Sequence, residues 1–69
     1  MSRLKILGIN IKKYRKAKGY RQLDLAEAIG VSEDYICRVE NGLKFLSLRR
    51  LFKLADVLDV KVSDLVDFD

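Results

Sequence analysis

Residues 22–42, QLDLAEAIGVSEDYICRVENG, consist of two short amphipathic segments joined by a glycine-containing tripeptide, Gly30-Val31-Ser32. The apolar residues of the first segment recur at helical spacing and predict a helix over residues 22–29. A second helix is expected to follow Ser32, which is a good N-cap, and to end at Asn41-Gly42. Two helices joined by so short a turn are typical of a helix-turn-helix, in which they meet at a steep angle.

A longer helix is expected before this stretch. The spacing of Leu7 and Ile11 places them on one apolar stripe, which predicts a helix over residues 7–18. Leu4 continues the stripe toward the N-terminus, so a start near Ser2 is the alternative.

Two more helices are expected after the stretch. Ser47 is the expected cap of a helix over residues 48–58, with Leu48 as the first residue of its inward stripe. Ser63 is the expected cap of a short last helix over residues 64–67.

The composition is that of one small domain. The chain has 69 residues, of which 49% are hydrophobic, and no alternating pattern typical of a strand is long enough to compete with the helices. We therefore predict an all-α fold, a compact five-helix domain that covers residues 1–69. The only cysteine, Cys37, indicates a reducing compartment. No apolar run has the length of a membrane span or the character of a signal peptide, so we expect a cytoplasmic protein without a membrane partner.

The residue types that are missing argue against several function classes. The chain has no histidine and one cysteine, so it offers no Ser/His or Cys/His catalytic pair and no clustered nitrogen–sulfur zinc site. It also has no glycine-rich phosphate loop. We expect no enzymatic activity, no metal, no cofactor and no small-molecule ligand.

The charge is distributed unevenly along the chain. Residues 1–22 carry eight of the 14 basic residues and no acid, whereas residues 23–69 carry the other six together with all ten acids. A basic end on a small domain indicates a polyanionic partner, which it would bind by neutralising phosphates and releasing counterions. The alternative is an ordinary solvated helix face.

The helix expected after Ser32 has two faces. Ile36 and Val39 point toward the core, and the residues opposite them are almost all polar. The positions on this opposite face are Glu33, Asp34, Cys37, Arg38 and Asn41.

An ordered set of motifs resembles the Cro/repressor-type helix-turn-helix regulators, often called the XRE family. The set is Gln22-x-x-Leu25-Ala26, then Gly30-Val31-Ser32, then Glu40-Asn41-Gly42, and the match extends over residues 7–66. The remaining residues that carry it are Leu7-Gly8, Ile11, Arg15, Lys18-Gly19-Tyr20, Ile29, Tyr35-Ile36, Val39, Ser47-Leu48, Leu51, Leu54-Ala55 and Leu58. The resemblance implies a lambda-repressor-like domain that binds double-stranded DNA, usually as a homodimer on a pseudo-palindromic operator.

The resemblance also implies roles for individual residues. The outward positions of the third helix would read base edges in the major groove; they are Glu33, Asp34, Cys37 and Arg38. The start of the second helix and the loop after the third match family positions that contact the DNA backbone, and we add basic residues and one tyrosine hydroxyl. The full backbone-binding set is Lys12, Lys16, Lys18, Arg21, Gln22, Tyr35, Asn41 and Lys44.

Two ion pairs within the protein are also predicted. Arg15 and Glu40 match a pair that forms an internal salt bridge in the family, which gives them a structural role. Arg38 could contact guanine or could pair with Asp34 four residues earlier, and the pair could orient Arg38 until DNA arrives. The chain departs from the family at Arg21, which stands where a Ser or Thr usually caps the second helix.

Apolar residues in the loop after the third helix and at the C-terminus raise a further possibility. Phe45, Leu46 and Phe68 could form a dimer interface, or they could close the bottom of the core. An alternative function is therefore a protein-interaction module of the same fold, an antitoxin-like protein or a restriction-system partner with weak or no specific DNA binding.

Overall fold

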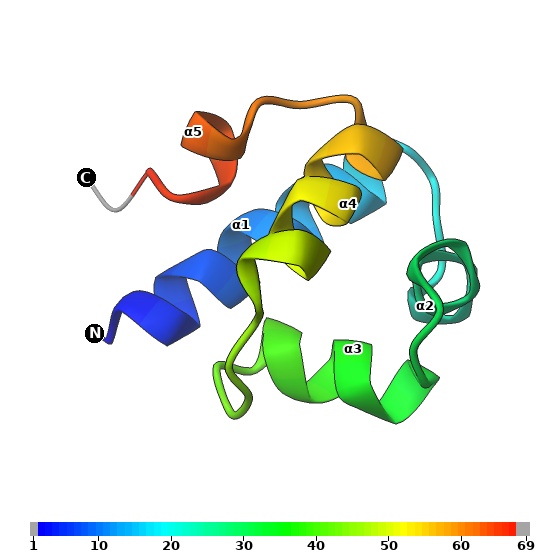
Figure 1. Ribbon diagram of the computed structural model, residues 1–69, viewed down its shortest axis with the longest axis horizontal. Helices are drawn as coiled ribbons and strands as arrows, with labels where there is room; N and C mark the ends of the chain where they lie inside the picture. Colours follow the sequence, from blue (N-terminus) through cyan, green and yellow to red (C-terminus); the bar gives the residue numbers. More distant parts are fainter. Residues whose placement is uncertain (1, 68–69) are drawn as a thin grey trace.

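The computed structural model describes residues 2–67, and this part of the chain forms five α-helices (Figure 1). They are α1 (Arg3–Ala17), α2 (Gln22–Ile29), α3 (Glu33–Glu40), α4 (Leu48–Leu58) and α5 (Val62–Leu65). The described residues contain no strand, so the predicted all-α class with five helices is confirmed. Within the same residues, no helix combines the length and apolar character that crossing a bilayer requires.

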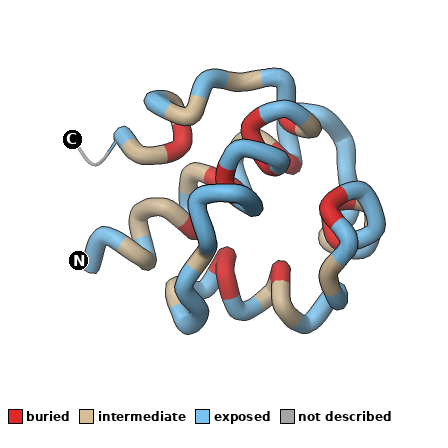
Figure 2. The backbone as a smooth tube through the Cα atoms, viewed as in Figure 1, coloured by how far each residue is buried: buried red, intermediate tan, exposed pale blue. Residues whose placement is uncertain are grey.

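The five helices share one hydrophobic core. α4 crosses in front of α1, while α2 and α3 lie to the right and below in Figure 1. The buried stretches of all five helices face the middle of the molecule, as Figure 2 shows. Each helix contributes at least one fully buried large side chain, and burial of such a side chain stabilises the fold by about 1.5–3 kcal/mol. These residues are Ile11, Leu25, Ile36, Leu54, Leu58 and Leu65.

Helix α1 follows the longer of the two alternatives and begins at Arg3. The Ser2 hydroxyl accepts a hydrogen bond from the Lys5 backbone N–H at 3.2 Å, which is a typical N-cap contact. Farther along α1, the Asn10 side-chain amide donates to the carbonyl oxygens of Leu65 and Asp67, each at 3.0 Å. These two bonds attach the end of α5 to the middle of α1.

Gly8 lies inside α1, where glycine normally weakens a helix. Its position is explained by the close crossing of α1 and the end of α3. A Cβ atom at Gly8 would overlap the carbonyl oxygens of Val39 and Glu40 and would lie 2.7 Å from the Glu40 carbonyl carbon. Glycine is therefore the residue that lets these two helices approach so closely.

The start of α2 is capped in an unexpected way. Arg21 occupies the N-cap position without a capping hydroxyl, but the Asp24 carboxylate accepts from the Arg21 backbone N–H at 2.8 Å. The Arg21 guanidinium donates to the same carboxylate through Nε at 3.1 Å and Nη2 at 2.9 Å. These side-chain bonds, followed by the backbone bond, lower the pKa of Asp24 from 3.8 to about 2.

This contact predicts an acid-sensitive contribution to stability. Because the pKa of Asp24 is lower in the folded chain than in the unfolded chain, its contribution is complete above about pH 4 and is lost as the pH falls toward 2. Asp24→Asn should therefore lower the unfolding temperature at pH 7 and should flatten its fall between pH 4 and pH 2. Thermal unfolding followed by circular dichroism across this range measures both. A parallel fall in the variant and the wild type would contradict the assignment.

Two expectations about the C-terminal half are wrong. Ser63 lies inside α5 rather than at its cap, because the helix begins one residue earlier and the Asp64 carboxylate accepts from the Lys61 backbone N–H at 3.0 Å. Leu48 is 59% exposed, since the buried stripe of α4 begins one turn later at Leu51. Leu46, in the preceding loop, packs against the core instead.

Candidate nucleic-acid interface

The turn between α2 and α3 has the local structure that its sequence predicts. Gly30 ends α2 in the left-handed conformation, with φ of +76°, which glycine adopts without steric cost. The Ser32 hydroxyl then accepts from the Tyr35 backbone N–H at 3.0 Å and starts α3. This turn leaves the outer side of α3 open to solvent at the bottom of the molecule in Figure 1.

A buried ion pair holds the end of α3 against α1. Arg15 Nε donates to Glu40 Oε2 at 2.6 Å, and Arg15 Nη2 donates to Glu40 Oε1 at 3.0 Å. The remaining guanidinium nitrogen, Nη1, donates to the Tyr20 carbonyl at 2.8 Å. The two side chains are only 8% and 3% exposed, so the pairing that the resemblance implied for them is present in a structural role.

Gln22 joins this network from the start of α2. Its side-chain amide donates to Glu40 Oε1 at 3.0 Å, a contact that the sequence did not suggest. The expectation was that Gln22 binds a DNA phosphate. The side-chain amide has two N–H donors and this bond uses one of them, so the other can still donate to a phosphate. The network therefore joins α1, α2 and α3 through one carboxylate.

The four base-reading candidates lie on α3. Glu33, Asp34 and Arg38 are exposed, and Cys37 is half-buried. Arg38 Nε donates to Asp34 Oδ2 at 2.8 Å, so the alternative pairing noted from the sequence is present. This hydrogen bond and the Asp34 charge raise the pKa of Arg38. At the end of the helix, the Asn41 amide lies 3.6 Å from Cys37 Sγ.

Tyr35 makes two contacts within the protein that the sequence did not suggest. Its hydroxyl, predicted to be available for a phosphate, donates to the Phe45 carbonyl at 2.8 Å and fixes the loop after α3. The Arg50 guanidinium carbon lies 4.9 Å from the centre of the Tyr35 ring, within the range of a cation–π contact. Arg50 is a residue that local sequence patterns could not pair with Tyr35, because the contact depends on how α4 packs.

Three of the five basic side chains that are predicted to bind the DNA backbone form no ion pair among the described residues. Lys12, Lys16 and Lys44 are exposed, and no ion pair is found for them among residues 2–67. Lys18 Nζ lies 3.7 Å from Asp59 Oδ2. Arg21 is held by Asp24, as described above, and its side chain is 75% exposed. Among the described residues, no group of three His, Cys, Asp or Glu side chains could hold a metal ion.

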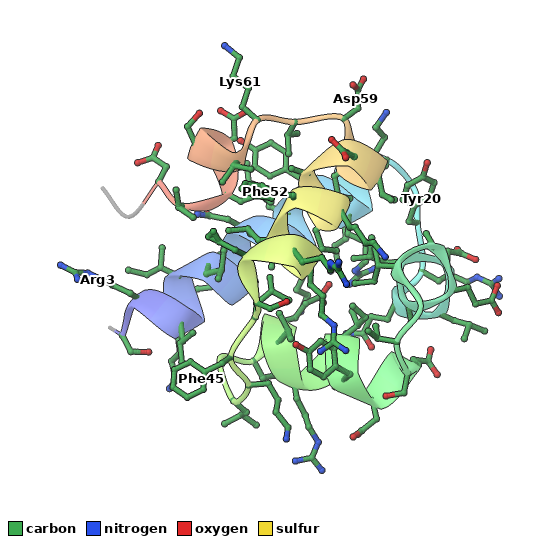
Figure 3. The ribbon with its side chains drawn as sticks, viewed as in Figure 1. Arg3, Tyr20, Phe45, Phe52, Asp59 and Lys61 are labelled. Atoms are coloured by element: carbon green, nitrogen blue, oxygen red, sulfur yellow. The ribbon has the colours of Figure 1, made fainter. Side chains whose placement is uncertain are left out.

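The exposed apolar residues differ from the set predicted from the sequence. Phe45 is 83% exposed, but Leu46 is half-buried against the core, and Phe68 lies outside the described residues. Leu48 and Phe52, one turn apart on α4, are 59% and 52% exposed. Phe45 and Phe52 lie on separate parts of the surface, on the loop and on α4 (Figure 3). The Leu46 side chain thus contributes to closing the core, which is the alternative given from the sequence, and the dimer interface stays a prediction.

A family model described as Helix-turn-helix (HTH_3) matches residues 11–65 of this chain. The chain belongs to the XRE-type helix-turn-helix family. The match spans the C-terminal half of α1 and all of α2, α3, α4 and α5, so the family resemblance stated from the sequence is confirmed.

Curated members of this helix-turn-helix family are similar over most of the chain. The HTH-type transcriptional regulator SinR of Bacillus subtilis (strain 168) is 43% identical over 63 residues, which are 90% of this chain and 57% of SinR. The chain thus spans little more than half the length of that relative. The uncharacterized HTH-type transcriptional regulator YazB of the same organism is 35% identical, with 87% of each chain covered.

Two solved structures of the family share the five-helix fold. The restriction-modification controller protein C.AhdI from Aeromonas hydrophila has a TM-score of 0.85 and 35% identity, covering 90% of this chain and 94% of its own. A crystal structure of SinR, described as the master regulator for biofilm formation in complex with DNA, has a TM-score of 0.82 and 44% identity. It covers 88% of this chain and 98% of that chain. The lambda-repressor-like fold predicted from the sequence is therefore confirmed.

Proposed function

We propose that this chain is a sequence-specific DNA-binding transcriptional regulator that places α3 in the major groove. The observation that carries the proposal is the exposed polar face of α3, held rigidly by the buried contact of Arg15 with Glu40. A short helix with a polar outer face and a fixed base is suited to enter a groove and contact base edges. The similarity to the SinR chain crystallised with DNA supports the same conclusion.

Two groups of residues have different tasks in this proposal. Exposed cations such as Lys12, Lys16 and Lys44 bind phosphates and set the position of the domain on the duplex. Arg38 and its neighbours on α3 distinguish one base pair from another. Residues 1–69 act as one DNA-binding domain in this account.

We further propose that the regulator binds as a homodimer on two half-sites related by two-fold symmetry. For a helix-turn-helix dimer, the half-sites lie about one helical turn, ~34 Å, apart. Leu48 and Phe52, exposed one turn apart on α4, support self-association, because a partner would remove their apolar side chains from water.

The same exposed side chains favour a second function, a protein-interaction module. One similar structure, with a TM-score of 0.83 and 43% identity, is described as a SinR protein/SinI protein complex. A gel shift with random-sequence duplex at low salt separates the two functions. Retarded bands that weaken with salt favour the DNA-binding regulator, whereas no retardation favours the protein-interaction module.

The division of tasks predicts different effects for Lys12→Ala and Arg38→Ala. Lys12→Ala should weaken binding to all sequences equally and should reduce the slope of log K against log salt by about 0.9. Arg38→Ala should instead relax the preference for guanine at one position, by about 1–3 kcal/mol. Fluorescence anisotropy with matched and single-substituted duplexes over a range of salt measures both.

Lys61→Ala is a matched control for this pair, because Lys61 extends from the loop before α5, at the end of the molecule opposite α3 (Figure 3). It should leave both the slope and the guanine preference unchanged. An equal loss of affinity for every sequence in Arg38→Ala would remove Arg38 as a base-reading residue.

A further inference from the structure

The contact between Asp34 and Arg38 leaves a defined edge of the guanidinium free. Asp34 Oδ2 accepts from Arg38 Nε at 2.8 Å, and both side chains are exposed, by 73% and 52% respectively. Among the contacts of residues 2–67, neither Nη1 nor Nη2 of Arg38 has an acceptor. The second oxygen of the carboxylate, Oδ1, likewise has no donor there.

A guanidinium has two edges that can donate two parallel hydrogen bonds. One edge consists of Nε and one Nη, and the other consists of both Nη atoms. Asp34 occupies Nε, so the edge with both Nη atoms is the one that remains for a bidentate acceptor. In the major groove, guanine presents two acceptors at the required spacing, O6 and N7.

We propose that Asp34 is a positioning residue for base recognition, which holds Arg38 with both Nη atoms directed at one guanine and offers Oδ1 to the exocyclic amine of an adjacent base. Cytosine N4 and adenine N6 are the amines that the major groove presents. This inference rests on the proposed function, because it assumes that α3 lies in the major groove.

The charge of the outer face explains why the pair is needed. Glu33 and Asp34 make the beginning of α3 acidic, and a free carboxylate in the groove is repelled by the phosphates. Pairing with Arg38 offsets part of this repulsion, and the arginine loses less side-chain freedom on binding. Asp34 therefore opposes DNA binding in general while it favours binding to the correct base.

This reasoning predicts effects of opposite sign for Asp34→Ala. Affinity for random-sequence duplex should rise by roughly twofold because one negative charge is removed. Discrimination in favour of the Arg38-dependent guanine should fall by roughly three- to tenfold because the guanidinium is no longer held. Asp34→Asn, which keeps an acceptor oxygen but not the charge, should retain part of the discrimination.

The control for the change of net charge is Glu27→Ala. Glu27 is an exposed acid on α2 without an ion pair among the described residues, and the proposal gives it no contact with DNA. Glu27→Ala should leave the discrimination at the guanine as it is in the wild type.

The experiment uses the sequence that the wild-type chain selects from a random duplex pool. The dissociation constants of wild type, Asp34→Ala, Asp34→Asn and Glu27→Ala are measured on this duplex, on a copy with the guanine replaced, and on a copy with 7-deazaguanine, which lacks the N7 acceptor. We expect 7-deazaguanine to weaken the wild type and to have a smaller effect on Asp34→Ala.

The outcomes separate this inference from the proposed function. If the wild type selects a sequence but Asp34→Ala keeps the full guanine discrimination, the inference is overturned and the proposed function stands. The inference is also overturned, and the proposed function stands, if no guanine in the selected sequence loses its preference in Arg38→Ala. If the wild type selects no sequence, the proposed function fails and the inference fails with it.

Discussion

Glu40→Ala is expected to lower the free energy of unfolding by about 3–5 kcal/mol. The substitution removes the acceptor of Arg15, whose residue is only 7% exposed, and of the Gln22 amide. Breaking a buried pair on one side costs about 3–5 kcal/mol, because a charge is left buried without a partner. A domain of this size has a total stability of about 3–10 kcal/mol, so the loss removes between about a third and all of it. Urea unfolding followed by circular dichroism measures the difference.

Two further variants test whether the buried charge is the cause. The double variant Arg15→Met with Glu40→Met removes both charges and should be more stable than Glu40→Ala, since no unpaired charge remains. Asp34→Ala removes one partner of an exposed pair with the same kind of contact, at 2.8 Å, and should change the stability by less than about 1 kcal/mol. A loss in Glu40→Ala as small as that in Asp34→Ala would contradict the role given to the buried pair.

Gly8→Ala is expected to destabilise the chain by about 3 kcal/mol or more, although alanine is ordinarily the better helix former by about 1 kcal/mol. The added methyl group would meet the backbone carbonyls of Val39 and Glu40, which cannot rotate away as a side chain can. In any fraction that stays folded, α3 must shift away from α1, so specific DNA binding should weaken as well.

Gly19→Ala is the matched control for this second prediction. Gly19 has a φ of +75°, and a Cβ there would meet no atom within 4 Å, so the change costs only the left-handed strain of about 1–2 kcal/mol. The free energies of unfolding of the two variants and of the wild type are compared. A larger loss in Gly8→Ala than in Gly19→Ala assigns the difference to the contact with the α3 carbonyls. A Gly8→Ala variant that is more stable than the wild type would show that α1 and α3 are not packed as closely as described.

Sequence patterns predict those helix limits that are determined by residues close by in the sequence. The limits of α2 and α4 follow from apolar spacing and from local caps such as Ser47, whose hydroxyl accepts from the Arg50 backbone N–H at 3.2 Å. The sequence predicts the start of α5 two residues too late, because Ser63 is the more usual N-cap residue, whereas the Asp64 carboxylate caps the helix by accepting from the Lys61 backbone N–H. The spacing of Leu48 fits the apolar stripe and predicts burial, but the core ends before this residue.

The site was predictable only where family motifs carried information about distant contacts. The Arg15–Glu40 pair came from the resemblance, and nothing in the local sequence joins these two positions. The bond from Gln22 to Glu40 and the stacking of Arg50 on Tyr35 depend on how helices pack, so no periodic pattern could indicate them. Gly8 was a similar case, because a glycine inside a helix looks like a weak position until the carbonyls facing it are known.

The most direct test of the central claim, that α3 reads DNA, is selection of bound duplexes from a random pool by the wild-type chain. The account predicts an enriched motif with two inverted half-sites about 34 Å apart and a guanine in each whose enrichment is lost in Arg38→Ala. A bound pool that has the same base composition at every position as the input pool would contradict it.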